Sequence, residues 1–245
     1  MKKTPFISVI IPTLQEEKLI GRILNQFSPE LRGRCNLEII VSDGGSTDQT
    51  LSIARTLADT VLELAQNAKQ NISMGRNVGA ASAKGEIFLF INCDTVIDDP
   101  ERFLSVMRES LQAEGIVAAT CAVEVYPEEQ TLADNLFHGF YNWYFKLLNT
   151  IGMGMGRGEC HVMKRDMFFE VGGYNEAIAA GEDYDLFVRL RRKGKVAFHS
   201  DIRVFESPRR YRKYGYLKIS LFWFLNAVSV FFFRRSMHKE WEAVR

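Results

Sequence analysis

Three acidic segments of the sequence have the residue types and the placement that catalysis requires. Residues 43–48 read Asp-Gly-Gly-Ser-Thr-Asp, residues 92–95 read Asn-Cys-Asp-Thr, and residues 181–186 read Gly-Glu-Asp-Tyr-Asp-Leu. Carboxylates act as general bases and hold divalent cations. Each segment lies where an expected strand or loop gives way to a helix, and open α/β sheets bind ligands at the carboxyl ends of their strands. Any one segment alone would also suit a helix N-cap, so the three together predict an enzyme.

The composition narrows the class of protein. A chain of 245 residues suits one α/β domain with appended elements, or at most two small domains. It carries 31 Lys and Arg against 30 Asp and Glu, a formal charge of +1, so we expect no nucleic-acid partner. The four cysteines lack the spacing of a zinc site or a disulfide framework, which indicates a reducing, cytoplasmic setting.

The order of apolar runs predicts the fold. Strands are expected at residues 6–11, 37–42, 60–64, 86–92 and 116–125, and helices at 16–27, 47–57, 72–83 and 100–113. Residues 1–12 resemble a signal peptide at first, but Pro12 and two glutamates end the apolar run without a cleavage site, which favours a buried first strand. The alternation predicts a doubly wound, mainly parallel, Rossmann-like α/β sheet.

The sequence changes character after Tyr126. An aromatic, helix-like segment at 136–145 leads into a glycine-rich loop at 152–158 and a strand-like segment at 160–163. The loop resembles a phosphate cradle, but a dinucleotide fingerprint needs a strand before it and a helix after it. A connector or a mobile active-site loop is the alternative that this context favours.

Six segments in order resemble the motif series of family 2 glycosyltransferases with the GT-A fold. The resemblance covers about residues 6–205 and implies inverting transfer of a sugar from a nucleotide-diphospho-sugar to an acceptor hydroxyl. A catalytically weak nucleotide-sugar binding module, a nucleotidyltransferase and a scaffold without a nucleotide are the alternatives. The six segments are residues 8–16, 41–48, 75–79, 92–95, 171–176 and 181–186.

The resemblance also implies the roles of individual residues on the acceptor side. Asp183 is implied as the base that takes the proton of the acceptor hydroxyl, with Glu182 as an acceptor contact. Gly172 and Gly173 are implied to shape the acceptor side, where they let the backbone approach a sugar. A helix N-cap for Asp183 and a plain turn for the glycines are the competing interpretations.

Donor recognition is implied for the first half of the sheet. Pro12, Thr13 and Glu16 would line the base and ribose pocket, Asp43 would accept from the base edge, and Arg76 would lie against the base or the phosphates. Thr13 with Glu16 also fits a capping box, and Arg76 also fits a solvated helix position.

A divalent metal, Mg²⁺ or Mn²⁺, is implied as cofactor. The family carries an Asp-x-Asp motif after the fourth strand, and here the first position is Asn92 and the second is Asp94. Asp94 is therefore the expected metal ligand, and Asn92 supplies a neutral carbonyl oxygen to the metal or binds the ribose. The metal site would carry one formal negative charge fewer than usual.

The end of the chain points to the acceptor. We expect a glycosyltransferase domain at 1–208, with a nucleotide-binding half at 1–98 and an acceptor half at 99–208, and a basic, aromatic helical tail at 209–245. The apolar segment 217–233 has arginines on both sides, which favours a helix in the interface of an anionic membrane over a helix buried against protein or a dimer partner, or a membrane span. The sequence thus predicts a peripheral protein at the inner membrane face, acting on a sugar or a lipid-linked acceptor, with a homodimer as a further possibility.

Overall fold

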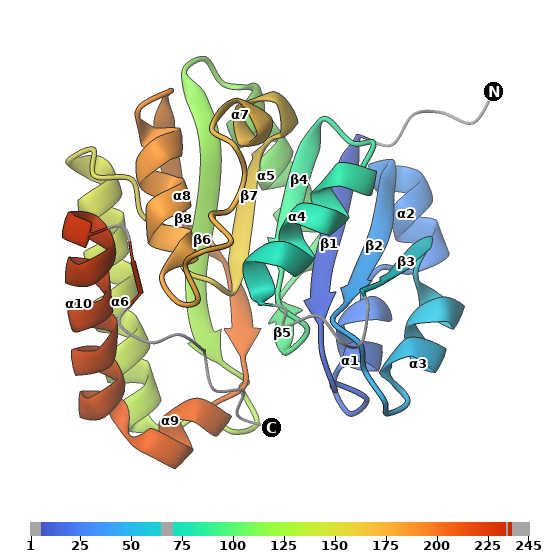
Figure 1. The fold of residues 1–245 in the computed structure, drawn as a ribbon, viewed down its shortest axis with the longest axis horizontal. Helices are drawn as coiled ribbons and strands as arrows, with labels where there is room; N and C mark the ends of the chain where they lie inside the picture. Colours follow the sequence, from blue (N-terminus) through green and yellow to red (C-terminus); the bar gives the residue numbers. More distant parts are fainter. Residues whose placement is uncertain (1–5, 65–70, 234, 237–245) are drawn as a thin grey trace.

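The computed structural model describes residues 6–64, 71–233 and 235–236. These residues form a single sheet of eight strands in the order β3-β2-β1-β4-β7-β6-β8-β5 (Figure 1). The strands are β1 (Ile7–Thr13), β2 (Leu37–Asp43), β3 (Thr60–Glu63), β4 (Ile87–Ile91), β5 (Thr95–Ile97), β6 (Ile116–Val125), β7 (Cys160–Lys164) and β8 (Lys195–Glu206).

The two halves of the sheet are built differently. β3, β2, β1 and β4 are all parallel, as the alternating pattern predicts, and Thr13 at the end of β1 lies opposite Asp43 at the end of β2. β7 then runs antiparallel to both β4 and β6, while β6 and β8 are parallel. The expected doubly wound α/β fold is confirmed, whereas β5 and β8 were not expected from the sequence.

Helices cover both faces of the sheet and give two apolar layers. One core cluster joins β-strand side chains such as Val9 and Val41 to α1, α2, α3 and α5, and the other joins Ile10 and Phe88 to α4, α7 and α8. The alternation of side chains along each strand produces both layers at once. The helices are α1 (Ile20–Leu24), α2 (Pro29–Cys35), α3 (Thr50–Leu57), α4 (Ile72–Ser82), α5 (Pro100–Gln112), α6 (Leu132–Thr150), α7 (Arg165–Glu170), α8 (Glu182–Arg191), α9 (Arg209–Tyr214) and α10 (Tyr216–Phe233).

Two helix starts differ from the expectation because side chains bind the backbone there. The helix expected at 16–27 begins only at Ile20, since Gln15 has a positive φ of 56° and the hydroxyl of Thr50 accepts a hydrogen bond from the Glu16 amide. The helix expected at 47–57 begins at Thr50 for the same reason. Residues 44–49, between β2 and α3, therefore form a non-helical loop at the carboxyl edge of the sheet.

The C-terminal helices lie against the rest of the domain. α6 and α10 are side by side beyond the β6 and β8 end of the sheet (Figure 1), and Trp223 of α10 contacts Phe137 and Tyr141 of α6 at 5.9 and 5.3 Å between ring centroids. Asn226 is buried and donates to the carbonyl of Ala180 at 2.8 Å. Among the described helices, none is long and apolar enough to cross a membrane.

Two arginines of the basic segment before α10 form ion pairs with carboxylates of the domain. Arg209 is paired with carboxylates of the first half, and Arg212 forms an ion pair of 2.6 Å with the buried Asp134. Arg210 lines a cavity, and Arg234 lies outside the described residues. We expected the boundary between domain and tail at position 208. In the structure, this position instead connects β8 to α9, which packs on the same domain.

Candidate active site

A cavity of about 170 Å³ opens where the two halves of the sheet meet. Its wall contains residues from every acidic segment except the first, together with aromatic side chains from α6 and α10. The residues that line it and carry charge are Arg76, Asp94, Arg157, Glu159, Glu182, Asp183, Glu206 and Arg210. The cavity thus unites five of the expected site residues, since Asn92 also lines it.

Two glycines of α4 bring Arg76 into this cavity. A Cβ on Gly79 would lie 2.4 Å from Ile10 of β1, and a Cβ on Gly75 would lie 3.4 Å from Pro12. Only glycine lets the helix approach the sheet so closely. The Gly-Arg-Asn-Val-Gly motif therefore has a physical reason, because the close approach carries the Arg76 side chain past the end of β1.

Arg76 is a buried hub rather than the solvated helix residue of the alternative interpretation. Its guanidinium forms an ion pair of 2.8 Å with Glu182, donates to Asn92 Oδ1 at 2.9 Å and donates to the carbonyl of Gly158 at 2.7 Å. It also lies 5.0 Å from the ring centroid of Tyr174. Arg76 thereby connects the loop after β4 with the start of α8.

Asp183 faces the cavity from the first turn of α8. Its Oδ1 accepts a hydrogen bond from the amide of Tyr184 at 2.9 Å. Burial and then the neighbouring Glu182 carboxylate raise the pKa of Asp183 well above its ordinary value, although Arg76 opposes the rise. A carboxylate with a raised pKa binds a proton more strongly, so Asp183 has the property of a general base.

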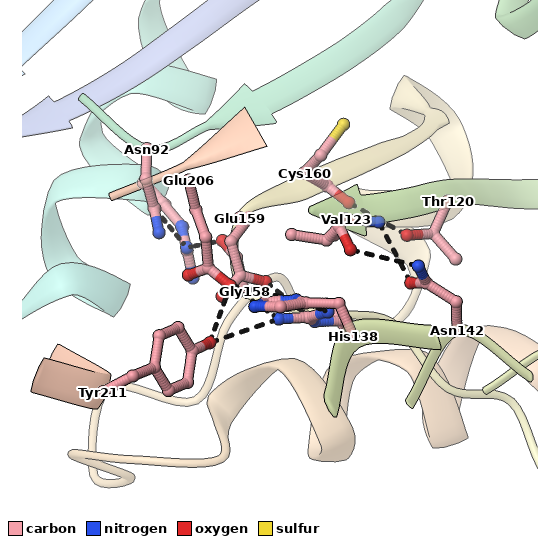
Figure 2. A network of polar contacts seen from close by, with 12 residues as sticks. Asn92, Thr120, Val123, His138, Asn142, Gly158, Glu159, Cys160, Glu206 and Tyr211 are labelled. Atoms are coloured by element: carbon pink, nitrogen blue, oxygen red, sulfur yellow. Dashed lines mark hydrogen bonds and ion pairs between the residues drawn. The ribbon is translucent and has the colours of Figure 1, made fainter. Parts of the chain in front are cut away.

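A buried ionic cluster that the sequence did not predict forms the floor of the cavity (Figure 2). Arg157, from the glycine-rich loop, pairs with Glu206 at 2.7 Å and Glu159 at 3.4 Å. Figure 2 shows Glu206, Tyr211 and His138 turned toward one another, and Tyr211 donates to Glu206 at 2.7 Å. The only sequence signal was a lone arginine among glycines.

This cluster shifts the pKa of its members in opposite directions. Burial and then the Glu159 carboxylate raise the pKa of Glu206 well above its ordinary value. Burial and then the Arg157 guanidinium lower the pKa of His138 to about 3, so that His138 is neutral at pH 7. At the floor of the cavity, the carboxylates of Glu159 and Glu206 therefore share the guanidinium of Arg157.

The donor-side residues are held by neutral hydrogen bonds instead. Asp43 is fully buried, and its carboxylate accepts from Thr13 Oγ1 at 3.0 Å, from Ser46 Oγ at 2.6 Å, and from the amides of Gly45 and Ser46. These bonds fix the loop after β2. Thr13 and Asp43 thus come together at the sheet edge, although neither lines the cavity.

Asp94 and Glu16 meet through a residue from the far end of the chain. Arg209 Nη2 lies 2.9 Å from Glu16 Oε1 and 3.0 Å from Asp94 Oδ2. The three side chains are partly buried, each less than a quarter exposed. The resemblance did not suggest Arg209, whose position in the sequence indicated a tail.

The expected acceptor glycines do not reach the cavity. Gly172 and Gly173 have φ of 82° and 67° and form the turn after α7. A Cβ on Gly173 would lie 2.9 Å from Asn77 Oδ1, and that oxygen accepts the amide of Tyr174. Both glycines lie in a turn, and Gly173 packs between Asn77 of α4 and Phe168 of α7, so their acceptor role stays a prediction.

Comparison with solved structures identifies the class of fold. A mannosyltransferase from Pyrobaculum calidifontis in complex with GDP-Man and Mn²⁺ superposes with a TM-score of 0.68 at 21% identity, over 88% of this chain and 63% of that one. Staphylococcus aureus TarS with UDP-GlcNAc gives a TM-score of 0.60 at 18% identity, over 82% and 58%. The fold is the GT-A fold of glycosyltransferases.

Sequence comparison then gives the family. The profile described as glycosyl transferase family 2 matches residues 8–172, and the chain belongs to this family. The succinoglycan biosynthesis protein ExoA of Rhizobium meliloti is 28% identical over 79% of this chain and 60% of its own length. Glycosyltransferase AglE of Haloferax volcanii is 30% identical over 58% and 47%. The chain thus spans about half to three fifths of the length of these relatives.

Proposed function

We propose that the protein is an inverting glycosyltransferase that moves a sugar from a nucleotide-diphospho-sugar to an acceptor hydroxyl. The observation that carries the proposal is the position of Asp183 in a cavity that also contains Arg76 and Asp94. The relatives named as glycosyltransferases and the neighbours bound to GDP-Man and UDP-GlcNAc support the same reaction. The proposed base and the residues proposed to bind the leaving diphosphate then line the same cavity.

Asp183 takes the proton of the acceptor hydroxyl in this reaction. The acceptor oxygen forms a bond to the anomeric carbon as the bond from that carbon to the diphosphate oxygen breaks, on the opposite face. The raised pKa of Asp183 makes its carboxylate a stronger acceptor for the released proton than an ordinary aspartate. Glu182 and Arg76 hold the start of α8 in place, and Glu182 adds an acceptor contact from the cavity wall.

The donor nucleoside occupies the edge formed by Pro12, Thr13, Glu16 and Asp43. All four lie at or just beyond the ends of β1 and β2, where doubly wound sheets bind nucleotides. The Asp43 carboxylate, which accepts from Thr13 Oγ1 in the structure, would also accept from a base N–H at this edge. Arg76 lines the cavity and would contact the phosphates of the donor there.

A divalent cation, Mg²⁺ or Mn²⁺, fits the residues after β4. Sites for Mg²⁺ commonly combine one or two carboxylates with substrate phosphates and waters. Asp94 would supply a carboxylate oxygen. The amide oxygen of Asn92 accepts a hydrogen bond from Arg76, and it would be available to the cation only after that bond breaks. In the part of the chain that the structure describes, no group of three or more His, Cys, Asp or Glu side chains is placed to hold a metal. Oxygens of the donor diphosphate would be further ligands. When bound, the cation neutralises negative charge on the leaving diphosphate.

The acceptor is carried on a lipid, and the protein binds a membrane through α6 and α10. Both helices expose apolar side chains along their outer faces, while their inner faces supply Phe145 and Trp223 to the cavity. The one carboxylate in these two helices is Asp134, which is buried. Lys146, Lys213 and Lys218 are exposed nearby and favour an anionic surface. The exposed apolar residues are Leu132, Leu136, Phe140, Trp143, Leu147, Ile151, Leu217, Leu221, Phe224, Leu225 and Val228.

The four buried cysteines are unpaired, which suits a reducing compartment and the cytoplasmic face of a membrane. A homodimer through the α6 and α10 face is the competing arrangement. Sedimentation with vesicles that contain anionic lipid, compared with the oligomeric state in solution, separates the two.

The reaction is tested by the variant Asp183→Asn. We expect turnover to fall by about a hundredfold or more, the typical loss for a general base, with nucleotide binding retained. Release of nucleoside diphosphate from a panel that includes GDP-mannose and UDP-N-acetylglucosamine is measured, with a membrane lipid extract as acceptor source. Asp185→Asn is the matched control, because Asp185 pairs with Arg189 on the same helix. Normal turnover of Asp183→Asn would contradict the assignment. Formation of a nucleotide sugar and pyrophosphate from a nucleoside triphosphate and a sugar 1-phosphate would indicate a nucleotidyltransferase.

A further inference from the structure

Arg209 forms an ion pair at the carboxylate that is also the proposed ligand of a divalent cation. Its guanidinium lies between Asp94, after β4, and Glu16, after β1, with three contacts of 2.9–3.3 Å. The Asp94 carboxylate is the group that the proposed function assigns to a divalent cation. In the structure, the Arg209 guanidinium forms an ion pair with that carboxylate.

A guanidinium and a divalent cation repel each other strongly at one carboxylate. Like charges held a few ångströms apart at a protein surface repel each other more strongly than they do in bulk water. These three side chains are partly buried, which limits screening by solvent. Arg209 therefore competes with a cation for Asp94, and cation binding is stronger when Arg209 leaves the Asp94 Oδ2 atom.

The chemistry of Arg209 indicates where it goes. The planar fork of an arginine matches the oxygens of a phosphate and donates to two of them at once. Arg210, the next residue, already lines the cavity that contains Asp94 and Asp183. Two consecutive arginines thus border the space in which the diphosphate of a donor would lie.

We propose that Arg209 and Arg210 form the diphosphate-binding site, and that Arg209 exchanges between two positions. Without a donor, Arg209 stays on Asp94 and Glu16. With the donor and cation present, Arg209 moves onto the diphosphate and leaves Asp94 to the cation. This inference rests on the proposed function for the metal role of Asp94, and it extends the donor site to α9.

The local structure allows such an exchange without refolding. α9 has six residues and follows Pro208, and Gly215 with φ of 77° ends it. Tyr211 is buried against the cluster and holds the helix in place, while the Arg209 side chain remains about a quarter exposed. Rotation of one long side chain is therefore sufficient.

The exchange predicts effects of opposite sign from one substitution. Arg209→Ala should bind Mn²⁺ alone about tenfold more tightly, because the competing charge is gone. It should bind inorganic pyrophosphate with Mn²⁺ about tenfold or more weakly, because a bidentate contact is lost. Arg209→Lys should keep weak Mn²⁺ binding and still lose pyrophosphate affinity, because it keeps the charge without the fork.

The full chain is titrated with Mn²⁺, with the free ion followed by electron paramagnetic resonance, and then with pyrophosphate by calorimetry. Lys213→Ala is the control, since it removes one positive charge from α9 at an exposed position. Unchanged affinities in Arg209→Ala, or changes of the same sign, overturn the proposal. Should Arg209→Ala fold poorly, the Arg209→Lys pattern decides in the same way.

Asp94→Ala separates this proposal from the proposed function. If Asp94→Ala leaves Mn²⁺ affinity unchanged, the metal role of Asp94 is wrong, and the exchange fails with it. If Asp94→Ala abolishes Mn²⁺ binding while Arg209→Ala leaves it at the wild-type value, the metal role stands and the exchange alone is overturned.

Discussion

The two sides of the site are held together by different forces. On the donor side, Asp43 is buried and satisfied by hydroxyl and amide donors from residues near it in the sheet. On the acceptor side, Asp183, Glu206 and Arg157 lie in a dense group of charges. A carboxylate that accepts several neutral hydrogen bonds fixes a loop, whereas carboxylates that share too few cations have raised pKa values. The comparison suggests that the donor side is built for shape and the acceptor side for proton transfer.

The largest expected effect is a loss of stability when the charged cluster on the acceptor side loses Arg157. Arg157→Met removes the cation from a cluster that keeps Glu206 and Glu159 buried. Breaking a buried pair by removing one partner typically costs about 3–5 kcal/mol, and we expect a loss of that order in the free energy of unfolding. Urea denaturation measures it, and Arg192→Met on the surface of the same half is the control. A loss below about 1 kcal/mol would contradict a structural role for the cluster.

The second effect concerns the apolar face, which only the acceptor side carries. The double variant Phe140→Ser with Phe224→Ser should reduce binding to anionic vesicles by about tenfold or more, because each ring buries apolar surface worth about 1 kcal/mol or more in the interface. High salt should weaken the wild-type attachment without abolishing it. Phe169→Ser, an exposed phenylalanine on α7, is the control. Equal sedimentation of all variants would favour the dimer instead.

A third prediction concerns the neutral hydrogen bonds that Asp43 accepts on the donor side. Asp43→Ala leaves the hydroxyl of Thr13 and the amides of Gly45 and Ser46 without their acceptor. Unsatisfied buried donors cost about 1–3 kcal/mol, so we expect a smaller loss of stability than for Arg157→Met, together with weaker nucleotide binding. Thermal unfolding with and without GDP or UDP measures both effects. A larger loss than that of Arg157→Met would reverse the comparison.

The smallest effect sharpens the proton-transfer argument. The ionised form of Asp183 is the active base, so kcat/KM should fall as pH drops through its raised pKa. Glu182→Gln removes the neighbouring charge, lowers the pKa of Asp183 and should shift this acid limb to lower pH by about one unit. The matched control is Glu176→Gln, an exposed residue outside the cavity. A limb that stays in place, or moves to higher pH, would show that Glu182 does not raise the pKa.

The sequence by itself determined the parallel half of the sheet and the polar residues at its edge. Alternating apolar runs are a local signal, and residues that directly follow a strand must lie at the carboxyl edge. Asp43, Asn92 and Asp94 were therefore located from short segments, whereas Asp183 was identified through the resemblance of residues 181–186 to a family motif. The glycines of α4 belong here too, because close helix packing leaves a readable residue type.

Only the tertiary structure decided which charges face each other. Arg157 and Glu206 are 49 residues apart, and Arg209 and Asp94 are 115 apart. Neither pair leaves a periodic or local mark, because an ion pair depends on where two distant segments meet. For the same reason the arginines after β8 were assigned to a lipid surface, although packing of α9 turns two of them toward carboxylates. The acceptor side of the site is thus a product of the fold, while the donor side follows from the chain.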